Sequence, residues 1–213
     1  NKTYVTPHSF DESLYKKINK KSKKDKLIIS YLGNFYGPRN PINLIKAMNQ
    51  IHNEDKDFFN GVTFRFTGRW VDNENWDLKF NNLPKDLIEV RNPVTYIESL
   101  NEMHNSDLLL ILDASFKLSV FFPSKLVDYI GAGKPIFAIT PQGSCLDILE
   151  KVGGLSANPE SVKSIQKGVT EAIIKLKKGE LISPSINYSA RFSNSLISKE
   201  FEILFQQLIL SSD

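Results

Sequence analysis

A short stretch near the middle of the chain combines an anion-binding helix start with an acid. In FFPSKLVDYIGAGKPIFAIT, Phe121 to Thr140, Pro123 is typical of the first turn of a helix. The free N–H groups of Ser124 and Lys125 would point out of that turn, where the helix dipole favours a phosphate. By spacing, Ser124, Lys125 and Asp128 share the helix face opposite the core. The pattern predicts a phosphate site with a carboxylate for the hydroxyls of an attached ribose, and an ordinary solvated acid is the alternative.

The turn from Gly33 to Arg39 is a second candidate for anion binding. YLGNFYGPRNP places Gly33, Asn34, Gly37 and Arg39 between an expected strand and an expected helix. Glycines let a ligand approach the backbone, and arginine can bind phosphate through two parallel hydrogen bonds. An ordinary turn with a surface arginine would look the same, so the spacing leaves both interpretations open.

Several common catalytic and cofactor motifs are absent. GAGKP at Gly131–Pro135 only superficially resembles a P-loop, because it follows an expected helix rather than a strand. No G-x-G-x-x-G follows the first strand, and neither H-E-x-x-H nor G-x-S-x-G occurs. His8, His52 and His104 are scattered, and Cys145 is the only cysteine. The sequence therefore predicts no internal disulfide, no metal site and no bound cofactor.

Apolar runs alternate with helical patterns along most of the chain. The expected strands are LIISYLG, GVTFRFTG, LIEVRN, DLLLILDA, PIFAIT and a short strand near Gly154. Continuous apolar strands are typical of parallel strands covered on both faces. The sequence predicts an α/β fold, a Rossmann-like doubly wound parallel sheet of about six strands with helices on both faces. Ligands of such sheets bind at the carboxyl ends of the strands.

Helix signals predict where several helices begin. Asn40 is an expected cap, with Pro41 as the first helical residue. Ser9, with Glu12 three residues later, matches a capping box. Two longer helices are expected to close the chain, roughly over residues 161–178 and 189–210.

Residues 1–26 are expected to be a connector, and residues 27–213 a single domain. Seven lysines lie between Lys16 and Lys26, and such a run is typical of a solvated helix end or connector. A contact with anionic lipid is the alternative. Nucleic acid is not expected as a partner, because no aromatic residues alternate with the lysines.

Length and composition limit the class of protein. The chain has 213 residues, a net charge of +3 and one cysteine. No apolar run reaches the roughly 18 residues of a membrane-spanning helix. These features fit a reduced, cytoplasmic setting. Because the chain begins with Asn rather than Met, we expect a fragment or a processed form.

Taken together, the two candidate stretches resemble a known family, the GT4-like group of GT-B-fold glycosyltransferases. The resemblance is to the C-terminal, donor-binding half of these enzymes, and it runs from YVTPHSFDE to the closing helices. YLGNFYGPRNPINLIKA resembles the family's first glycine turn and helix. PSKLVDYIGAGKPIFA resembles its nucleotide-binding helix, VTYIESLNEMHNSDLLLILDA the segment that holds the base, and PQGS the glycine turn that follows.

The resemblance implies roles for particular residues. Asp128 stands where the family has a ribose-binding glutamate. The backbone near Asn92, Val94 and Tyr96 would hold the base. The implied diphosphate-binding residues are Gly33, Asn34, Arg39, Ser124 and Lys125. No catalytic residue of this chain and no metal are implied.

Two departures from the family pattern affect these assignments. The family often has a further glutamate ahead of the ribose-binding acid, at the position of Val120 here, and it helps to hold the donor sugar. Asn34 takes the place of the family's usual arginine, and Arg39 takes the place of its lysine. The contacts to the sugar are therefore the least defined part of the expected site.

The resemblance also implies a function. We expect the donor-binding domain of a retaining enzyme that moves a sugar from a nucleotide diphosphate sugar to a glycan or lipid-linked acceptor in bacterial surface polysaccharide synthesis. An N-terminal acceptor domain is expected as partner, and this chain alone is expected to be inactive. The expected location is cytoplasmic, with peripheral contact at the inner membrane face as an option. The alternatives are a non-catalytic nucleotide-binding or membrane-docking module, and a nucleotide-sugar epimerase of the same fold.

Overall fold

The protein is described by a computed structural model over residues 3–15, 18, 25–71, 80, 82–114, 118–119 and 122–210. The strands are β1 (Leu27–Leu32), β2 (Val62–Thr67), β3 (Ile88–Arg91), β4 (Leu108–Leu112), β5 (Leu118–Ser119), β6 (Ile136–Ile139), β7 (Gln142–Gly143) and β8 (Leu155–Ala157). The helices are α1 (Glu12–Tyr15), α2 (Ile42–Glu54), α4 (Tyr96–His104), α5 (Ser124–Gly131), α6 (Ser144–Lys151), α7 (Val162–Lys178), α8 (Ile186–Ser189), the 3₁₀ helix η1 (Ala190–Phe192) and α9 (Asn194–Leu210).

Six parallel strands form the main sheet, in the order β3-β2-β1-β4-β6-β8. The predicted doubly wound α/β sheet is confirmed. The chain leaves β1 towards β2 and β3, then returns to place β4 on the other side of β1. The carboxyl ends of β1 and β4 therefore flank a topological switch point, where ligands of such sheets bind.

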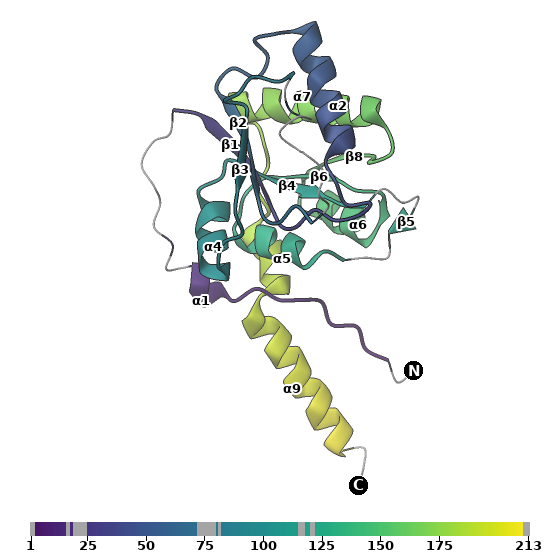
Figure 1. Ribbon diagram of the computed structural model, residues 1–213. Coiled ribbons are helices and arrows are strands. Elements are labelled where there is room, and N and C mark those ends of the chain that lie inside the picture. The colour runs from purple at the N-terminus through teal and green to yellow at the C-terminus, as the bar shows by residue number, and fades with distance from the viewer. Residues whose placement is uncertain are drawn as a thin grey trace.

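Helices cover both faces of the sheet (Figure 1). Helices α2 and α7 pack on one face, in a core that contains Phe64, Leu110 and Phe137. Helices α4, α5 and α6 lie on the other face, where Leu109 and Ile111 point. Successive side chains of β4 therefore pack into the cores on opposite faces of the sheet. This explains why the strand has no polar face.

The helix starts differ from the predictions at two places. Helix α2 begins at Ile42, one residue later than expected, and Asn40 Oδ1 accepts a hydrogen bond from Ile42 N at 3.1 Å. The predicted Ser9 cap is wrong, because α1 begins at Glu12 and Ser13 N donates to Asp11 Oδ1 at 2.9 Å. An aspartate directly before the helix supplies the capping oxygen instead.

The expected final helix over 189–210 is interrupted. Ser193 is extended, with φ −73° and ψ 143°, and α9 begins only at Asn194. The cause is a tertiary contact with the N-terminal segment. Phe10 N donates to Phe192 O, and Asn194 N donates to Phe10 O, both at 2.9 Å. This pairing uses backbone groups that a continuous helix would need.

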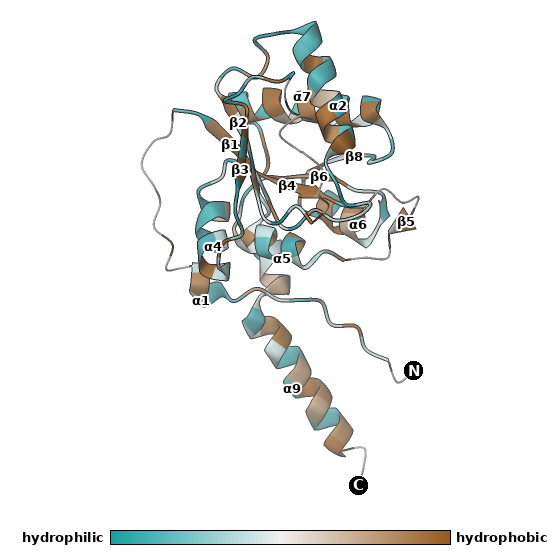
Figure 2. Ribbon diagram, viewed as in Figure 1, coloured by the Kyte–Doolittle hydropathy of each residue, from teal (hydrophilic) through white to brown (hydrophobic). Residues whose placement is uncertain are grey.

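Helix α9 extends away from the sheet (Figure 1), and much of its surface is apolar (Figure 2). Phe201 and Phe205 are both exposed and stack on each other with centroids 6.1 Å apart. Ile197 is its one buried residue. Among the described residues, no helix combines the length and the apolar character needed to cross a bilayer.

Candidate functional site

The turn after β1 brings the two predicted phosphate-binding stretches into contact. Gly33 has a φ of 145°, in the region that favours glycine, and its N–H donates to Thr67 O at 2.9 Å. A Cβ atom on Gly33 would collide with the ammonium of Lys125. The lack of a side chain at Gly33 therefore leaves room for Lys125 at the carboxyl end of β1.

The Lys125 side chain is largely buried at this point. Its Nζ lies 4.1 Å from the centroid of the Tyr31 ring, which stacks on Phe35. It forms no hydrogen bond or ion pair with any residue that the structure describes. Burial, together with the nearby charge of Arg39, lowers the pKa of Lys125 to about 7, although Asp113 acts in the opposite direction.

The sequence placed Lys125 on the same outward face as Ser124 and Asp128. Ser124 is exposed, Lys125 and Asp128 are both partly buried, and the Lys125 ammonium reaches the turn after β1. The aromatic face of Tyr31 and the space at Gly33 accept the lysine there.

Arg39 is held by a buried acid. Its Nη2 lies 3.1 Å from Asp113 Oδ1, and its Nη1 donates to Tyr36 Oη at 2.8 Å. Asp113 also accepts from Ala114 N at 2.8 Å and from the Thr140 hydroxyl at 3.3 Å. The buried Nε of Arg39 has no hydrogen-bond partner among the described residues. The guanidinium is therefore fixed in direction but keeps donor capacity.

The sequence did not identify Asp113, although a signal was present. Asp113 follows the buried run of β4 directly, so it lies at the carboxyl end of a central strand. A carboxylate at such a position, across the switch point from Arg39, could have been expected to pair with it.

The start of α5 is open to solvent. Pro123 occupies the N-cap position and makes no side-chain capping bond. The first hydrogen-bonded amide is Leu126 N, which donates to Pro123 O at 2.9 Å. Within the described chain, the amides of Ser124 and Lys125 have no backbone acceptor, as at any helix start, and such amides can bind an anion.

Asn34 forms hydrogen bonds within the chain on both sides of the turn after β1. Its Oδ1 accepts from Arg69 N at 2.9 Å, and its backbone O accepts from the Tyr31 hydroxyl at 3.1 Å. The bond from Arg69 holds the turn after β1 against the turn after β2, and the bond from Tyr31 closes the first turn on its own strand. The Asn34 side chain therefore stabilises the turn after β1.

Asp128 and Tyr96, predicted for ribose and base, are in direct contact. Tyr96 Oη donates to Asp128 Oδ1 at 2.8 Å, and Tyr15 Oη lies 3.3 Å from the same oxygen. Burial raises the pKa of Asp128, while the bonds from Tyr96 and Tyr15 and the charge of His8 oppose that rise. The sequence missed Tyr15, because residues 1–26 were expected to be a connector outside the site.

The loop between β3 and α4 carries the other predicted base-binding residues. Asn92 and Val94 are exposed, and Thr95 caps α4 in a capping box with Glu98. Val94 also lines a cavity of about 830 Å³ between α4 and strands β2 and β3. Of the three predicted base-binding residues, Tyr96 forms a hydrogen bond with Asp128. Among the described residues, neither Asn92 nor Val94 forms such a bond with Asp128.

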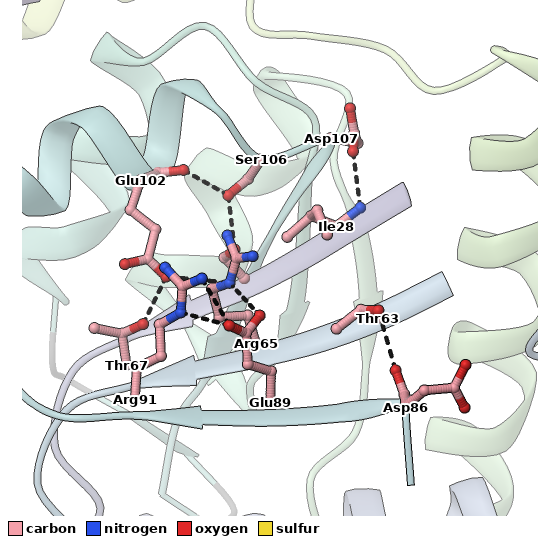
Figure 3. A network of polar contacts seen from close by, with 11 residues as sticks. Ile28, Thr63, Arg65, Thr67, Asp86, Glu89, Arg91, Glu102, Ser106 and Asp107 are labelled. Carbon is pink, nitrogen blue, oxygen red and sulfur yellow. Dashed lines mark hydrogen bonds and ion pairs between the residues drawn. The ribbon is translucent and has the colours of Figure 1, made fainter. Parts of the chain in front are cut away.

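A network of charged side chains lines that cavity (Figure 3). Arg65 Nε and Arg91 Nη2 contact Glu89 at 2.7 and 2.6 Å, and the Thr67 hydroxyl donates to Glu102 at 2.6 Å. These charges compensate one another across two strands and a helix. The network stabilises a sheet face that α4 leaves partly uncovered, and it offers no excess charge.

Comparison with solved structures identifies the fold. HepE from Anabaena, solved with UDP-glucose, matches with a TM-score of 0.67 and 16% identity, over 93% of this chain and 56% of that one. Sucrose-phosphate synthase from Thermosynechococcus elongatus gives 0.70 and 14%, over 98% and 53%. The pneumococcal O-GlcNAc transferase GtfA, solved with UDP and GlcNAc, gives 0.66 and 14%, over 96% and 38%.

The chain is therefore a Rossmann-like half of the GT-B glycosyltransferase fold. It spans little more than half the length of the first two of these proteins, and less of the third. No protein-family model matches the sequence, and a search of curated proteins gives no significant match.

Proposed function

We propose that this chain is the nucleotide-sugar donor-binding domain of a retaining, GT4-like glycosyltransferase that acts in bacterial surface polysaccharide synthesis. Two observations carry the proposal. The ammonium of Lys125 lies beside Gly33 without a hydrogen bond or ion pair to any described residue, and α5 begins without a side-chain cap. These groups lie at the switch point of a fold whose solved neighbours include a UDP-glucose complex.

In the proposed site the diphosphate lies between α5 and the turn after β1. The amides of Ser124 and Lys125 would donate to one phosphate, and the Lys125 ammonium and the Arg39 guanidinium would face the other. Asp113 neutralises part of the Arg39 charge, so the three ionised groups carry one net positive charge.

The chemical role of these groups is electrostatic. As the bond between the sugar and the diphosphate breaks, negative charge grows on the leaving phosphate. Fixed donors stabilise that charge without reorganising, and the ion pair with Asp113 fixes the direction of Arg39. We expect no metal to be needed, because these protein groups perform the neutralisation.

A second domain completes the proposed enzyme. We assign residues 1–26 to the connector and residues 27–213 to the donor domain, and we assign acceptor binding to an N-terminal partner domain. The exposed apolar surface of α9 fits a helix that packs on another domain. Accordingly, the isolated chain is expected to bind nucleotide but not to transfer sugar.

Calorimetric titration with UDP, GDP and ADP tests the proposal. We expect one diphosphate to bind selectively, and Asp128→Ala and Lys125→Met each to weaken it by about tenfold or more. The control variants are Asp147→Ala and Lys167→Met, which remove the same charges at exposed positions of α6 and α7. Binding that is equally insensitive to all four substitutions would contradict the proposed site.

A further inference from the structure

Two tyrosines from separate parts of the chain hold one oxygen of the Asp128 carboxylate. Tyr96, the first residue of α4, donates to Asp128 Oδ1 at 2.8 Å. Tyr15, the last residue of α1, lies 3.3 Å from Oδ1 and donates to the backbone O of Asp128 at 3.0 Å. Within the described residues, no hydrogen bond reaches Asp128 Oδ2.

Both phenols remain donors at neutral pH. Burial and the hydrogen bond to Asp128 raise the pKa of Tyr96 to about 12. Burial and the charge of Asp128 raise the pKa of Tyr15 even further. Because both phenols keep their protons at neutral pH, each can donate to Oδ1, and Tyr96 lies at 2.8 Å from it. Hydrogen bonds to Oδ1 fix the orientation of the carboxylate group. The direction of Oδ2 is fixed with it.

We propose that Tyr96 and Tyr15 are positioning residues for nucleoside binding: they hold Asp128 Oδ1 so that Oδ2 is the oxygen that accepts from ribose. This inference rests on the proposed function, and it adds the N-terminal segment to the nucleoside site. It also gives Tyr96 a role through its hydroxyl in place of the expected contact with the base.

The N-terminal segment is anchored firmly enough to take this role. The ring of Phe10 is buried against α5, where a Cβ on Gly131 would lie 2.7 Å from Phe10 Cγ. Tyr15 packs edge-on against that ring, with centroids 5.4 Å apart. The backbone of Phe10 is also bonded to Phe192 and Asn194. Nucleoside binding at Asp128 is thereby linked to the docking of residues 10–15 on α5.

The other titratable groups near the carboxylate act less strongly. The charge of His8 lowers the pKa of Asp128, after the two phenols. Asp11 acts on Tyr96 and raises the pKa of that phenol. From the core side of α5, Tyr129 bonds to Leu32 N and Leu110 O and not to Asp128.

The test measures UDP and 2′,3′-dideoxy-UDP binding by calorimetry in Tyr96→Phe, Tyr15→Phe and the exposed control Tyr4→Phe. The wild-type chain is expected to prefer UDP. In Tyr96→Phe, UDP binding should weaken about fivefold while dideoxy-UDP binding stays unchanged, so that the preference shrinks. Tyr15→Phe should show a smaller loss, because its proton is shared with the backbone O. Tyr4→Phe should match the wild type.

A pH series separates positioning from a general structural role. The phenols lower the pKa of Asp128, so their removal should move the acid-side loss of UDP binding to higher pH. Because Tyr96 is half-exposed, Tyr96→Phe should leave the protein folded. The melting temperature in thermal unfolding checks this.

Three results for the variants would overturn the inference, and a fourth, for the wild type, would overturn the proposed function too. Tighter UDP binding in Tyr96→Phe would mean that the phenol competes with ribose. Equal losses for UDP and dideoxy-UDP, without the pH shift, would mean a structural role only. Variants that keep the wild-type preference would remove the inference alone, whereas a wild-type chain that binds neither nucleotide would remove the proposed function as well.

Discussion

The charge on Lys125 depends on pH within the range where the protein would work. Burial and Arg39 depress its pKa to about 7, so the ammonium is only partly charged in the empty site. A bound diphosphate would favour the charged form. Binding and proton uptake are therefore coupled at this residue.

We predict that UDP affinity falls as pH rises from about 7 to about 9, because the free lysine loses the proton that the bound form needs. The phosphates themselves are already fully ionised over most of this range, since their last pKa is about 6. Calorimetry at several pH values measures the slope. In Lys125→Met the affinity should be lower and nearly independent of pH, and an unchanged slope in that variant would exclude Lys125 as its source.

Gly33→Ala should disturb both folding and binding. The alanine would have to adopt the φ of 145° that Gly33 has, which side chains rarely allow. Its Cβ would also collide with the Lys125 ammonium. We expect a loss of at least about 1 kcal/mol in the free energy of unfolding, measured by denaturant titration, together with weaker UDP binding. Gly37→Ala is the control, because its φ is also positive but a Cβ there meets nothing within 4 Å. If Gly37→Ala weakened UDP binding as much, backbone strain alone would explain the effect.

The N-terminus of α4 positions Tyr96, and its cap can be removed selectively. Thr95 Oγ1 accepts from Glu98 N at 3.3 Å, and Glu98 Oε2 accepts from Thr95 N at 2.8 Å. Thr95→Ala should cost about 1 kcal/mol of unfolding free energy in a denaturant titration, and Thr95→Ser should restore most of it. Equal stability of the two variants would show that the hydroxyl does not cap the helix.

The elements defined by local chemistry were predictable from sequence. The six apolar strands follow from burial periodicity. Helix α5 begins at Ser124, one residue after Pro123, which the sequence placed in the first turn. The break at Ser193 was not predictable, because Phe10 lies far away in sequence and its pairing decides where α9 begins. Local signals cannot report such long-range contacts.

For the candidate site, the sequence indicated residue types but not the pairings between them. Ser124, Lys125 and Asp128 stood out because their spacing suits a phosphate and a ribose. The partners that fix them, Tyr15 on Asp128 and Asp113 on Arg39, come from other segments and carry no motif. Val120, where the family pattern has a sugar-binding glutamate, lies outside the described residues.

At the scale of the whole molecule, helix α9 buries a single residue, Ile197, against the rest of the described chain. Phe205 is 58% exposed, whereas Ile197 is 5% exposed. Phe205→Glu should change the free energy of unfolding by less than about 0.5 kcal/mol, and Ile197→Glu by more than about 2 kcal/mol, in denaturant titrations. A large loss of stability in Phe205→Glu would mean that α9 packs on the domain.

The most direct test of the proposed site is a crystal structure of the chain with the diphosphate that binds best. We predict one phosphate at the amides of Ser124 and Lys125, the other beside the Lys125 ammonium, and a ribose hydroxyl on Asp128 Oδ2. Phosphates found instead in the cavity between α4 and strands β2 and β3, next to Arg65 and Arg91, would contradict the account.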